Sequence, residues 1–385
     1  MCGILVYHNP DGLDRGEVDE CIRSLALINH RGPDGEGVLL FNTTTRNYAY
    51  WDTYDTPEDK RTGAQPDPTQ FDLLLGHRRL SIQDVTSAGH QPMIAHNAII
   101  LFNGEVYNFP EIRMDLEKKG YQFESTGDTE VILAAYKEWG EDCFARFNGM
   151  WAMCLTDLSS GKVVLSRDRF GVKPLYTSTN GKTTICASEI KQFTAFPSFS
   201  AVPDMRGVRS FLDHGMLEED SHTLLKDVAI FPAASIAKMI EGQLQTPRKF
   251  YQIPECKDTW SSFNDACDAF RALFADAVKV RLRTDVPWGI GLSGGMDSSA
   301  VVYAAHRLLD GEQKRFDVFS AVFPGHEMNE EEHIDTIVKD LNLDAHKTVP
   351  SSEFGHTAMR RHIHAQDTPT VSTSFFAQHM VAKLA

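Results

Sequence analysis

The sequence begins Met1-Cys2-Gly3-Ile4, which places a cysteine directly after the initiator methionine. Removal of Met1 would leave a thiol and a free α-amino group on the same residue. Thiols titrate near pKa ~8.5 and α-amino groups near ~7.7 to 8, so at neutral pH part of the amine is free to accept the thiol proton. The pair predicts an N-terminal nucleophile that carries its own base. Taken alone, a cysteine at position two is equally explained by chance.

Residues 293–299 read Ser-Gly-Gly-Met-Asp-Ser-Ser and lie between an expected strand and an expected helix. The two glycines permit a tight turn whose backbone amides point inward, and a helix N-terminus adds the positive end of its dipole. Together these features predict a cradle for an anion. The loop lacks the lysine of GxxxxGK[ST] loops, so it is not the kind that transfers a γ-phosphate. Serine and glycine at this position also fit a plain turn and helix cap.

Three polar segments, at 77–82, 102–108 and 125–130, together offer the groups needed to recognise an amino acid. Arg79 would bind an α-carboxylate through two parallel hydrogen bonds, and Glu105 and Asp128 would face an α-ammonium. Asn103 and the Gly104 amide would hold an oxyanion. Each residue alone also has a structural explanation: Arg79 as a surface ion pair, Asn103-Gly104 as a hairpin turn and Asp128 as a helix cap.

Composition narrows the class of protein. The chain has 385 residues, of which 42% are hydrophobic, as expected of a globular protein with two domains. The net charge of −15 argues against nucleic acid or an anionic membrane as a partner. Seven cysteines are scattered without a C-x-x-C pair, so we expect a reducing compartment and neither a disulfide framework nor a zinc site. We find no signal-peptide pattern and no membrane-length apolar run, and therefore expect a cytoplasmic protein.

Apolar periodicity predicts a strand-rich first half and an alternating second half. The first half has expected strands at 4–7, 99–102 and 150–156, expected helices at 17–29 and 129–139, and a polar excursion at 52–70. Pro232, Pro247 and Pro254 favour a connection over the segment 211–254. The second half has expected helices at 262–280, 298–309 and 330–341, and expected strands at 288–292 and 316–323. This alternation predicts a parallel sheet with crossover helices.

Eight short motifs occur in the order in which glutamine-dependent asparagine synthetases carry them. They are MCGI at 1–4, HRGPDGEG at 30–37, GHRRLSI at 76–82, FNGEVYN at 102–108, TGDTEV at 126–131, RDRFGVKPLY at 167–176, ASEIK at 187–191 and LSGGMDSS at 292–299. The chain therefore resembles this family over nearly its whole length. Its last motif resembles the pyrophosphate-binding loop of enzymes that cleave ATP between the α and β phosphates.

The resemblance implies an α+β fold followed by an α/β fold. Residues 1–210 would form a class II glutamine amidotransferase domain, which is an antiparallel αββα sandwich. Residues 211–254 would form a connecting segment. Residues 255–385 would form a parallel-sheet α/β ATP-binding domain of the asparagine synthetase type. The family continues beyond the helix that residues 375–384 resemble, so we expect this last domain to be truncated.

The resemblance also implies roles for individual residues. Cys2 matches the catalytic nucleophile, and Asn103 and Gly104 match the oxyanion hole. Asp367 falls where the family has an acidic residue near the second active site. The residues expected at the glutamine site are Arg79, Leu80, Ser81, Ile82, Gln83, Asn103, Gly104, Glu105 and Asp128. The residues expected at the ATP site are Leu292, Ser293, Gly294, Gly295, Asp297, Ser298 and Ala321. No residue is assigned as a metal ligand.

The reaction implied by the resemblance has two halves. Cys2 would attack the glutamine side-chain amide, forming a thioester and releasing ammonia, and water would then release glutamate. ATP and aspartate would form an aspartyl adenylate, which ammonia converts to asparagine, with AMP and pyrophosphate released. Mg²⁺ would accompany ATP. The expected partners are therefore glutamine, aspartate and ATP, with no nucleic acid and no membrane, and a homodimer is an open possibility.

Other functions share part of this pattern. A β-lactam-forming synthetase has both domains but does not use glutamine, and Cys2 with the glutamine-binding set argues against it. A sugar-phosphate or phosphoribosyl amidotransferase shares only the first domain, and the loop at 293–299 argues against it. Two alternatives stay open: an amidotransferase of secondary metabolism that acts on another carboxylate, and a glutaminase or regulatory remnant without full synthetase activity.

Overall fold

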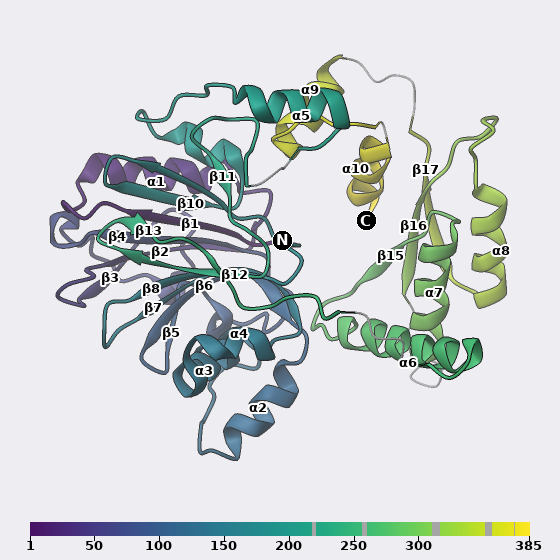
Figure 1. The fold of residues 1–385 in the computed structure, drawn as a ribbon, viewed down its shortest axis with the longest axis horizontal. Coiled ribbons are helices and arrows are strands. Elements are labelled where there is room, and N and C mark those ends of the chain that lie inside the picture. The colour runs from purple at the N-terminus through teal and green to yellow at the C-terminus, as the bar shows by residue number, and fades with distance from the viewer. Residues whose placement is uncertain (218–220, 256–259, 310–315, 351–355, 373) are drawn as a thin grey trace. The chain divides into compact units, whose positions relative to one another are not determined.

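The computed structural model describes residues 1–217, 221–255, 260–309, 316–350, 356–372 and 374–385. The chain divides into two compact units, Met1–Pro254 and Glu255–Ala385. The first unit contains two antiparallel sheets, and the second contains a small parallel sheet (Figure 1). Within the described ranges, no helix combines the length and the apolar character needed to span a membrane.

Two seven-stranded sheets, called sheet A and sheet B here, lie face to face in the first unit. Sheet A has the strand order β11-β9-β10-β1-β4-β2-β3 and consists of β1 (Gly3–His8), β2 (Gly35–Phe41), β3 (Tyr48–Trp51), β4 (Leu73–Arg79), β9 (Tyr176–Asn180), β10 (Thr183–Ala187) and β11 (Ala229–Ile230). Sheet B has the order β13-β12-β8-β7-β6-β5, with β14 paired to β12, and consists of β5 (Met93–Ala95), β6 (Ala98–Val106), β7 (Gly149–Asp157), β8 (Val163–Arg167), β12 (Ser235–Ile240), β13 (Gln243–Leu244) and β14 (Arg248–Lys249).

The sheets pack through alternate residues of their strands. Leu73 and Leu75 of β4 enter the core between the sheets, whereas Leu74 faces the helix layer outside sheet A. Ile99 and Leu101 of β6 enter the same inter-sheet core from the opposite side. Successive side chains of a strand point to opposite faces, so one strand supplies two different layers. Strands buried on both faces read as continuous apolar runs, as in the Leu-Leu-Leu of β4.

Helices cover the outer face of each sheet, which produces four layers (Figure 1). The helix over sheet A begins with a capping box, in which the Asp14 and Glu17 side chains each accept a backbone N–H hydrogen bond from the other residue. Its apolar face packs with Leu5 and Leu74. The helices of this unit are α1 (Arg15–Ala26) over sheet A, α2 (Phe109–Glu117), α3 (Asp128–Trp139) and α4 (Cys143–Arg146) over sheet B, and α5 (Met205–His214).

The segment 211–254 differs from the connection that its prolines suggest. It contributes β11, β12, β13 and β14 to the two sheets, and it belongs to the first compact unit. Residues 235–239 of β12 pair with residues 163–167 of β8. The prolines gave a wrong prediction because Pro232, Pro247 and Pro254 lie outside the strands of this segment. None of them interrupts β12, its longest strand.

The second unit is a parallel α/β arrangement with the strand order β15-β16-β17. Its core joins the sheet to one face of three helices, through residues such as Val318, Val302 and Ile334. A further helix, α10, packs against β16 and β17. In chain order the elements are α6 (Phe263–Arg281), β15 (Gly289–Gly291), α7 (Met296–Leu309), β16 (Asp317–Ala321), α8 (Glu331–Leu341), β17 (Asp344–Thr348), α9 (His356–Gln366) and α10 (Ser374–Leu384).

The predicted fold class is confirmed: an antiparallel αββα sandwich precedes a parallel-sheet α/β unit. The expected strands at 4–7, 99–102 and 150–156 lie within β1, β6 and β7. The six cysteines in the described ranges are free thiols, and Cys256 lies outside those ranges.

Candidate active site

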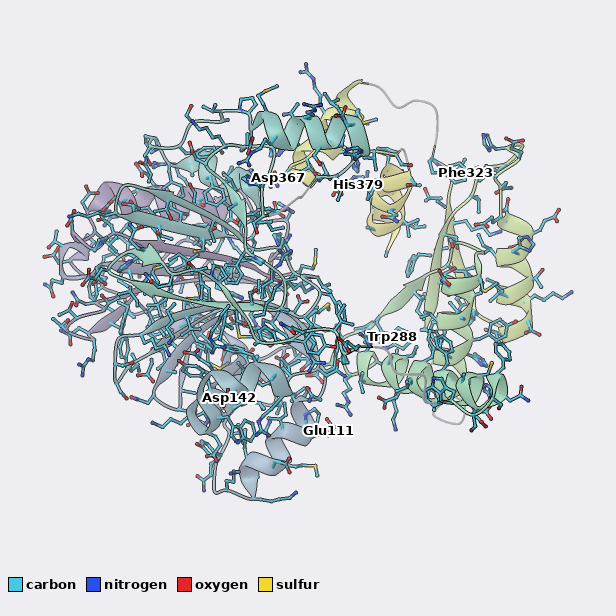
Figure 2. The ribbon with its side chains drawn as sticks, in the orientation of Figure 1. Glu111, Asp142, Trp288, Phe323, Asp367 and His379 are labelled. Atoms are coloured by element: carbon cyan, nitrogen blue, oxygen red, sulfur yellow. The ribbon has the colours of Figure 1, made fainter. Side chains whose placement is uncertain are left out.

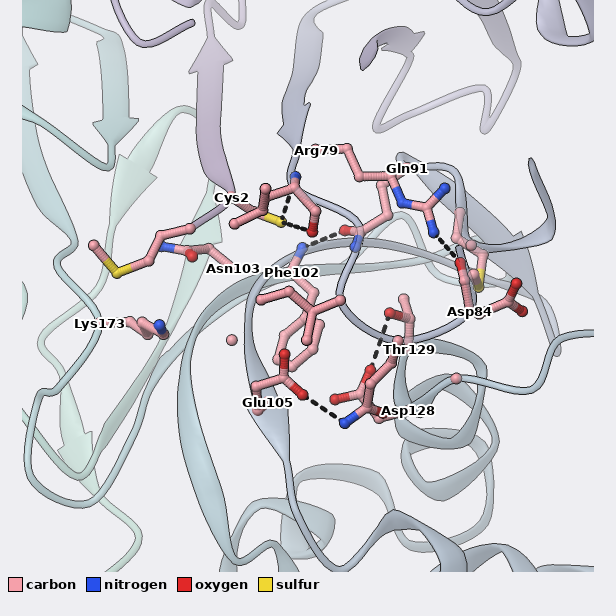
Figure 3. A pocket seen from close by; sticks show the side chains of 18 of the residues that line it. Cys2, Arg79, Asp84, Gln91, Phe102, Asn103, Glu105, Asp128, Thr129 and Lys173 are labelled. Atoms are coloured by element: carbon pink, nitrogen blue, oxygen red, sulfur yellow. Dashed lines mark hydrogen bonds between the residues drawn. The ribbon is translucent and has the colours of Figure 1, made fainter. Parts of the chain in front are cut away.

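The alternation that builds the inter-sheet core also builds a polar pocket at one end of it. Arg79 follows Leu75 at even spacing along β4, and Asn103 and Glu105 follow Leu101 along β6. Cys2 stands two residues before the core residue Ile4. The same period of two that places apolar side chains between the sheets therefore directs these polar groups into one space. The pocket is lined by Met1, Cys2, Arg79, Leu80, Ile82, Gln83, Asp84, Gly89, Gln91, Met93, Phe102, Asn103, Gly104, Glu105, Ser125, Gly127, Asp128, Thr129, Met150 and Lys173 (Figure 3).

Cys2 is held at the start of β1 by contacts on its thiol and on its backbone. Its Sγ lies 3.3 Å from the backbone N of Leu80 and 3.5 Å from the Leu80 carbonyl oxygen. The Nε of Arg31 donates to the Cys2 carbonyl oxygen at 2.9 Å. Burial raises the pKa of the Cys2 thiol, and the Leu80 N–H and the terminal amine oppose this rise. A thiol in this environment needs a base to become a nucleophile.

Met1 lines the pocket beside Cys2, and its Sδ accepts a weak hydrogen bond from Nη2 of Arg31 at 3.9 Å. Burial lowers the pKa of the terminal amine, and the positive charges of Arg31 and Lys173 lower it further. The negative forms of Cys2 and Asp34 raise it. Removing Met1 would vacate part of the pocket and transfer the free amine to Cys2. The lowered pKa of the Met1 amine shows that this end of the pocket favours a neutral amine, the form that accepts a proton.

Arg79 is buried on the side of the pocket away from Lys173 (Figure 3), and a loop anchors its guanidinium. Its Nη1 donates to the Thr86 carbonyl oxygen at 2.7 Å, and its Nη2 donates to the Asp84 carbonyl oxygen. The Asp84 carboxylate in turn accepts from the Thr126 N–H at 2.8 Å. Arg79 is therefore not a surface ion pair. A guanidinium has five N–H donors, so the two loop contacts fix its plane and leave capacity for a ligand carboxylate.

Asn103 and Gly104 lie inside β6 rather than in a hairpin turn. The Asn103 side chain is 1% exposed, and neither its Oδ1 nor its Nδ2 has a hydrogen-bond partner in the described part of the chain. Buried amide groups are normally paired, so this side chain is poised for a ligand that supplies the missing bonds. The amide nitrogen is a donor of the kind that stabilises an oxyanion.

Two carboxylates occupy the part of the pocket below Asn103 in Figure 3. Glu105 accepts a hydrogen bond from Nε2 of Gln83 at 2.6 Å. Asp128 is the first residue of α3, and its Oδ2 accepts from the Val106 N–H at 2.8 Å. Burial raises the pKa of Asp128 to about 7, although the Val106 contact lowers it. A cationic ligand would restore the ionised form of Asp128 by charge pairing.

Ser81 is the member of the expected glutamine set that does not line the pocket. Its backbone N–H donates to Oδ2 of Asp34 at 2.7 Å, which ties the strand end to the loop after α1. Leu80, Ile82 and Gln83 do line the pocket. The structure thus gathers eight of the nine expected residues, as Arg79, Leu80, Ile82, Gln83, Asn103, Gly104, Glu105 and Asp128, around the thiol of Cys2.

The loop expected to bind ATP lies at the carboxyl edge of the parallel sheet in the second unit. It follows β15 and runs into α7, and Ala321 ends the neighbouring strand β16 at the same edge. Ligands of open parallel sheets bind at this edge. Gly294 has a φ of +90°, a conformation that residues with a Cβ rarely adopt.

Serine hydroxyl groups hold this loop in shape. Oγ of Ser293 and Oγ of Ser298 are 3.0 Å apart, and Oγ of Ser298 also accepts from the Ser293 N–H at 3.2 Å. Leu292 is buried under the loop, and its carbonyl oxygen accepts from the Ser320 hydroxyl at 2.6 Å. Gly295 and Asp297 lie at the start of α7, where a helix N-terminus attracts anions. Asp367, labelled in Figure 2, follows α9 with a positive φ of 60°.

Comparison with known proteins places the chain in a family. A glutamine amidotransferase domain matches residues 62–251, and an asparagine synthase domain matches residues 269–385. The putative glutamine-hydrolysing asparagine synthetase 2 of Methanocaldococcus jannaschii is 30% identical over 379 residues, which cover 93% of this chain and 67% of that protein. The chain belongs to the glutamine-hydrolysing asparagine synthetase family. The resemblance carried by the eight sequence motifs is thereby confirmed.

Two further similarities were found. Asparagine synthetase 3 of Bacillus subtilis is 34% identical over 271 residues, which cover 68% of this chain and 44% of that protein. The chain thus spans about two thirds of one relative and less than half of the other. A solved structure of glutamine phosphoribosylpyrophosphate amidotransferase from B. subtilis, complexed with ADP and GMP, gives a TM-score of 0.49 at 14% identity, covering 92% of this chain and 83% of that one.

Lys173 is a pocket residue to which the sequence analysis gives no role, although it lies in the motif at 167–176. It is only 6% exposed, although a lysine in a polar turn usually reads as solvent-facing. Burial lowers the pKa of its ammonium group, and Arg31 lowers it further. Figure 3 shows Lys173 on the other side of Cys2 from Arg79 and Asp84. Its charge therefore acts on the terminal amine and the thiol together.

Replacing Lys173 tests this electrostatic contribution. Lys173→Met removes a positive charge, so the pKa values of the amine and the thiol should both rise. The acidic limb of the pH profile of kcat/KM for glutamine hydrolysis should move to higher pH, and Lys173→Arg should keep the wild-type limb. An unshifted acidic limb in Lys173→Met, with activity retained, would contradict this account.

Asp128 predicts a pH dependence of glutamine binding. Its pKa of about 7 leaves the carboxyl group partly protonated at neutral pH. Only the ionised form attracts an ammonium group, so binding should strengthen as the pH rises through this value. We expect the KM for glutamine to fall between about pH 6 and pH 8, and Asp128→Asn to show a higher KM without this trend. A wild-type KM that rises over this interval would argue against the assignment.

Proposed function

We propose that the first unit hydrolyses glutamine at Cys2, and that the second unit uses ATP to activate aspartate for amidation by the released ammonia. The observation that carries the proposal is the convergence of a thiol, a guanidinium, an unpaired amide and two carboxylates on one pocket. Membership of the family supports both halves.

The charges of the pocket match a zwitterionic amino acid. Arg79 offers donors for the α-carboxylate, and Glu105 with Asp128 offers negative charge for the α-ammonium. The thiol of Cys2 and the unpaired amide of Asn103 are then left for the far end of the ligand, which in glutamine is a carboxamide. Matching three separated groups explains how a small polar substrate is oriented without a large apolar surface.

The first step joins the thiol to the substrate. After loss of Met1, the neutral amine of Cys2 takes the thiol proton, and the sulfur attacks the carboxamide carbon. The carbonyl oxygen becomes an oxyanion that the Asn103 amide and the Gly104 N–H stabilise. The ammonium formed on Cys2 gives its proton to the departing nitrogen, so ammonia leaves and a thioester remains.

The second step releases glutamate. A water molecule loses a proton to the same amine and attacks the thioester carbon, and the same oxyanion donors stabilise the second tetrahedral intermediate. Collapse of this intermediate expels the Cys2 thiolate, which recovers the proton held by the amine. The γ-carboxyl group formed in this collapse loses its remaining proton to solvent, which gives glutamate. The amine of Cys2 carries the other proton transfers of the cycle.

ATP is assigned to the loop of residues 293–299 in the second unit. The turn after β15 and the N-terminus of α7 provide backbone N–H groups and a positive dipole end for phosphate oxygens. The described residues hold no cluster of three His, Cys, Asp or Glu side chains suited to a metal ion. Mg²⁺ would therefore be held chiefly by the phosphate oxygens, with Asp297 as the nearby carboxylate, and would neutralise phosphate charge.

Removing the nucleophile gives the most direct test of the proposal. Cys2→Ala should reduce release of glutamate from glutamine to the background rate, because no other pocket residue carries a thiol. ATP binding should be unchanged, since the ATP loop belongs to the other unit. The matched control is Cys267→Ala, which removes a half-buried thiol of α6. Substantial glutaminase activity in Cys2→Ala would refute the proposed nucleophile.

Asn103→Ala tests the oxyanion stabilisation separately from the nucleophile. Loss of one such donor lowers kcat by about 10² to 10³-fold, which corresponds to about 2.7 to 4 kcal/mol of transition-state stabilisation. The KM for glutamine should change much less, because the Asn103 amide acts on charge that develops only during the reaction. Steady-state kinetics of glutamate release measure both constants. A variant that loses affinity and keeps kcat would assign Asn103 to substrate binding instead.

A further inference from the structure

The backbone of Phe102 is held by two side chains where its neighbouring strand stops. β5 pairs with β6 only as far as Met93, opposite Ile100. Two residues further along β6, the Phe102 N–H donates to Oε1 of Gln91 at 2.6 Å. The Phe102 carbonyl oxygen lies 3.1 Å from Nε2 of His77. His77 and Gln91 thus continue the hydrogen-bonding edge of β6 in place of a strand.

The carbonyl held by His77 belongs to the peptide bond that joins Phe102 to Asn103. Its orientation fixes the plane of the Asn103 backbone and hence the direction of the unpaired Asn103 side chain. Backbone groups alternate sides along a strand, so the Gly104 N–H points to the same side of β6 as the Phe102 N–H. Both candidate oxyanion donors are therefore set by the backbone that His77 and Gln91 hold.

His77 reaches Phe102 across the inter-sheet layer. It lies on β4 of sheet A, two residues before Arg79, and is 1% exposed. Burial lowers the pKa of His77 to about 3, so the ring is neutral at working pH and carries one proton. Because its partner is a carbonyl oxygen, that proton is on Nε2, and Nδ1 is left without a partner in the described part of the chain.

Gly37 makes the position of Gln91 possible. A Cβ at Gly37 would lie 2.1 Å from the Gln91 carbonyl oxygen and 2.7 Å from Nε2 of His90. No residue other than glycine lets the backbone at Gln91 pass this closely over β2. Gln91 is 5% exposed, and its side chain lines the pocket next to Phe102 (Figure 3).

We propose that His77 and Gln91 are positioning residues that clamp the Phe102 backbone and thereby hold Asn103 and Gly104 in the geometry for oxyanion stabilisation. This proposal rests on the glutaminase function proposed above. The clamp links the strand that carries Arg79 to the strand that carries the oxyanion donors. A contact between the two sheets thus fixes the position of Arg79, which would bind the substrate, relative to the oxyanion donors Asn103 and Gly104.

The test compares variants that remove or keep each hydrogen-bonding atom. His77→Leu removes the donor, whereas His77→Gln places an amide nitrogen near the position of the imidazole Nε2. Gln91→Met removes the acceptor, whereas Gln91→Glu keeps an oxygen there. We expect His77→Leu and Gln91→Met to lower kcat for glutamine hydrolysis by about 10²-fold with little change in KM, since small displacements of reacting groups have this effect. His77→Gln should recover most of kcat.

A buried histidine elsewhere in the same sandwich provides the matched control. His8 is 2% exposed at the far end of β1 from Cys2, and His8→Leu should leave kcat unchanged. Equal kcat in His77→Leu, His77→Gln and wild type would overturn the clamp. A variant in which KM rises while kcat stays at the wild-type value would also overturn the clamp, because a clamp of the oxyanion donors acts on the transition state.

A second measurement decides the proposal without relying on turnover. Hydrogen exchange of peptides that contain Phe102 to Gly104, followed by mass spectrometry, should be faster in His77→Leu and Gln91→Met and near wild type in His77→Gln. Unchanged exchange in His77→Leu would overturn the clamp. If His77→Leu fails to fold, the same comparison of exchange rates is made between Gln91→Met and Gln91→Glu. A wild type that releases no glutamate refutes the glutaminase proposal, while the exchange result still decides the clamp.

Discussion

The period of two along paired strands is the constraint on which the first unit depends. Each strand of the two sheets sends alternate side chains into the layer between them, and that layer is apolar for most of its length. At one end the same positions carry a guanidinium, an amide and a carboxylate instead of leucine and isoleucine. The candidate active-site pocket is therefore the polar end of a hydrophobic core. A shift of one residue in the register of β4 or β6 would send these groups to the helix layers.

Electrostatics explains why the terminal amine suits this pocket. Burial raises the pKa of the Cys2 thiol and lowers the pKa of the neighbouring terminal amine, which belongs to Met1. The two shifts have opposite signs because burial disfavours the charged form of each group, and the charged forms are the thiolate and the ammonium. Arg31 and Lys173 add positive charge, which favours the neutral amine. A base held within the same residue needs no side chain of its own in this crowded space.

Much of this candidate site was predictable from the order of residues in the sequence. The remainder was not predictable, and the reasons can be identified. Cys2, Arg79, Asn103 and Asp128 stand in short motifs whose residue types suggest their chemistry. Asn103-Gly104 also reads as a hairpin turn, and only the pairing of β6 with β7 shows that it lies within a strand. His77 and Lys173 lie inside the motifs at 76–82 and 167–176, and Gln91 lies in none of the eight motifs. The contacts of His77 and Gln91 are with Phe102, distant in the sequence, and Lys173 reaches the pocket from a distant segment, so local pattern alone gives none of the three a role. The strands of segment 211–254 were obscured by the prolines that flank them.

The place of Met1 within the pocket has a practical consequence for preparing this protein. Any residue ahead of Cys2, Met1 included, converts the Cys2 amine into an amide, which is not a base. Under the proposed mechanism, an affinity tag that stays attached at that end would leave glutamine hydrolysis inactive. The proposed mechanism likewise makes removal of Met1 the step that frees the base.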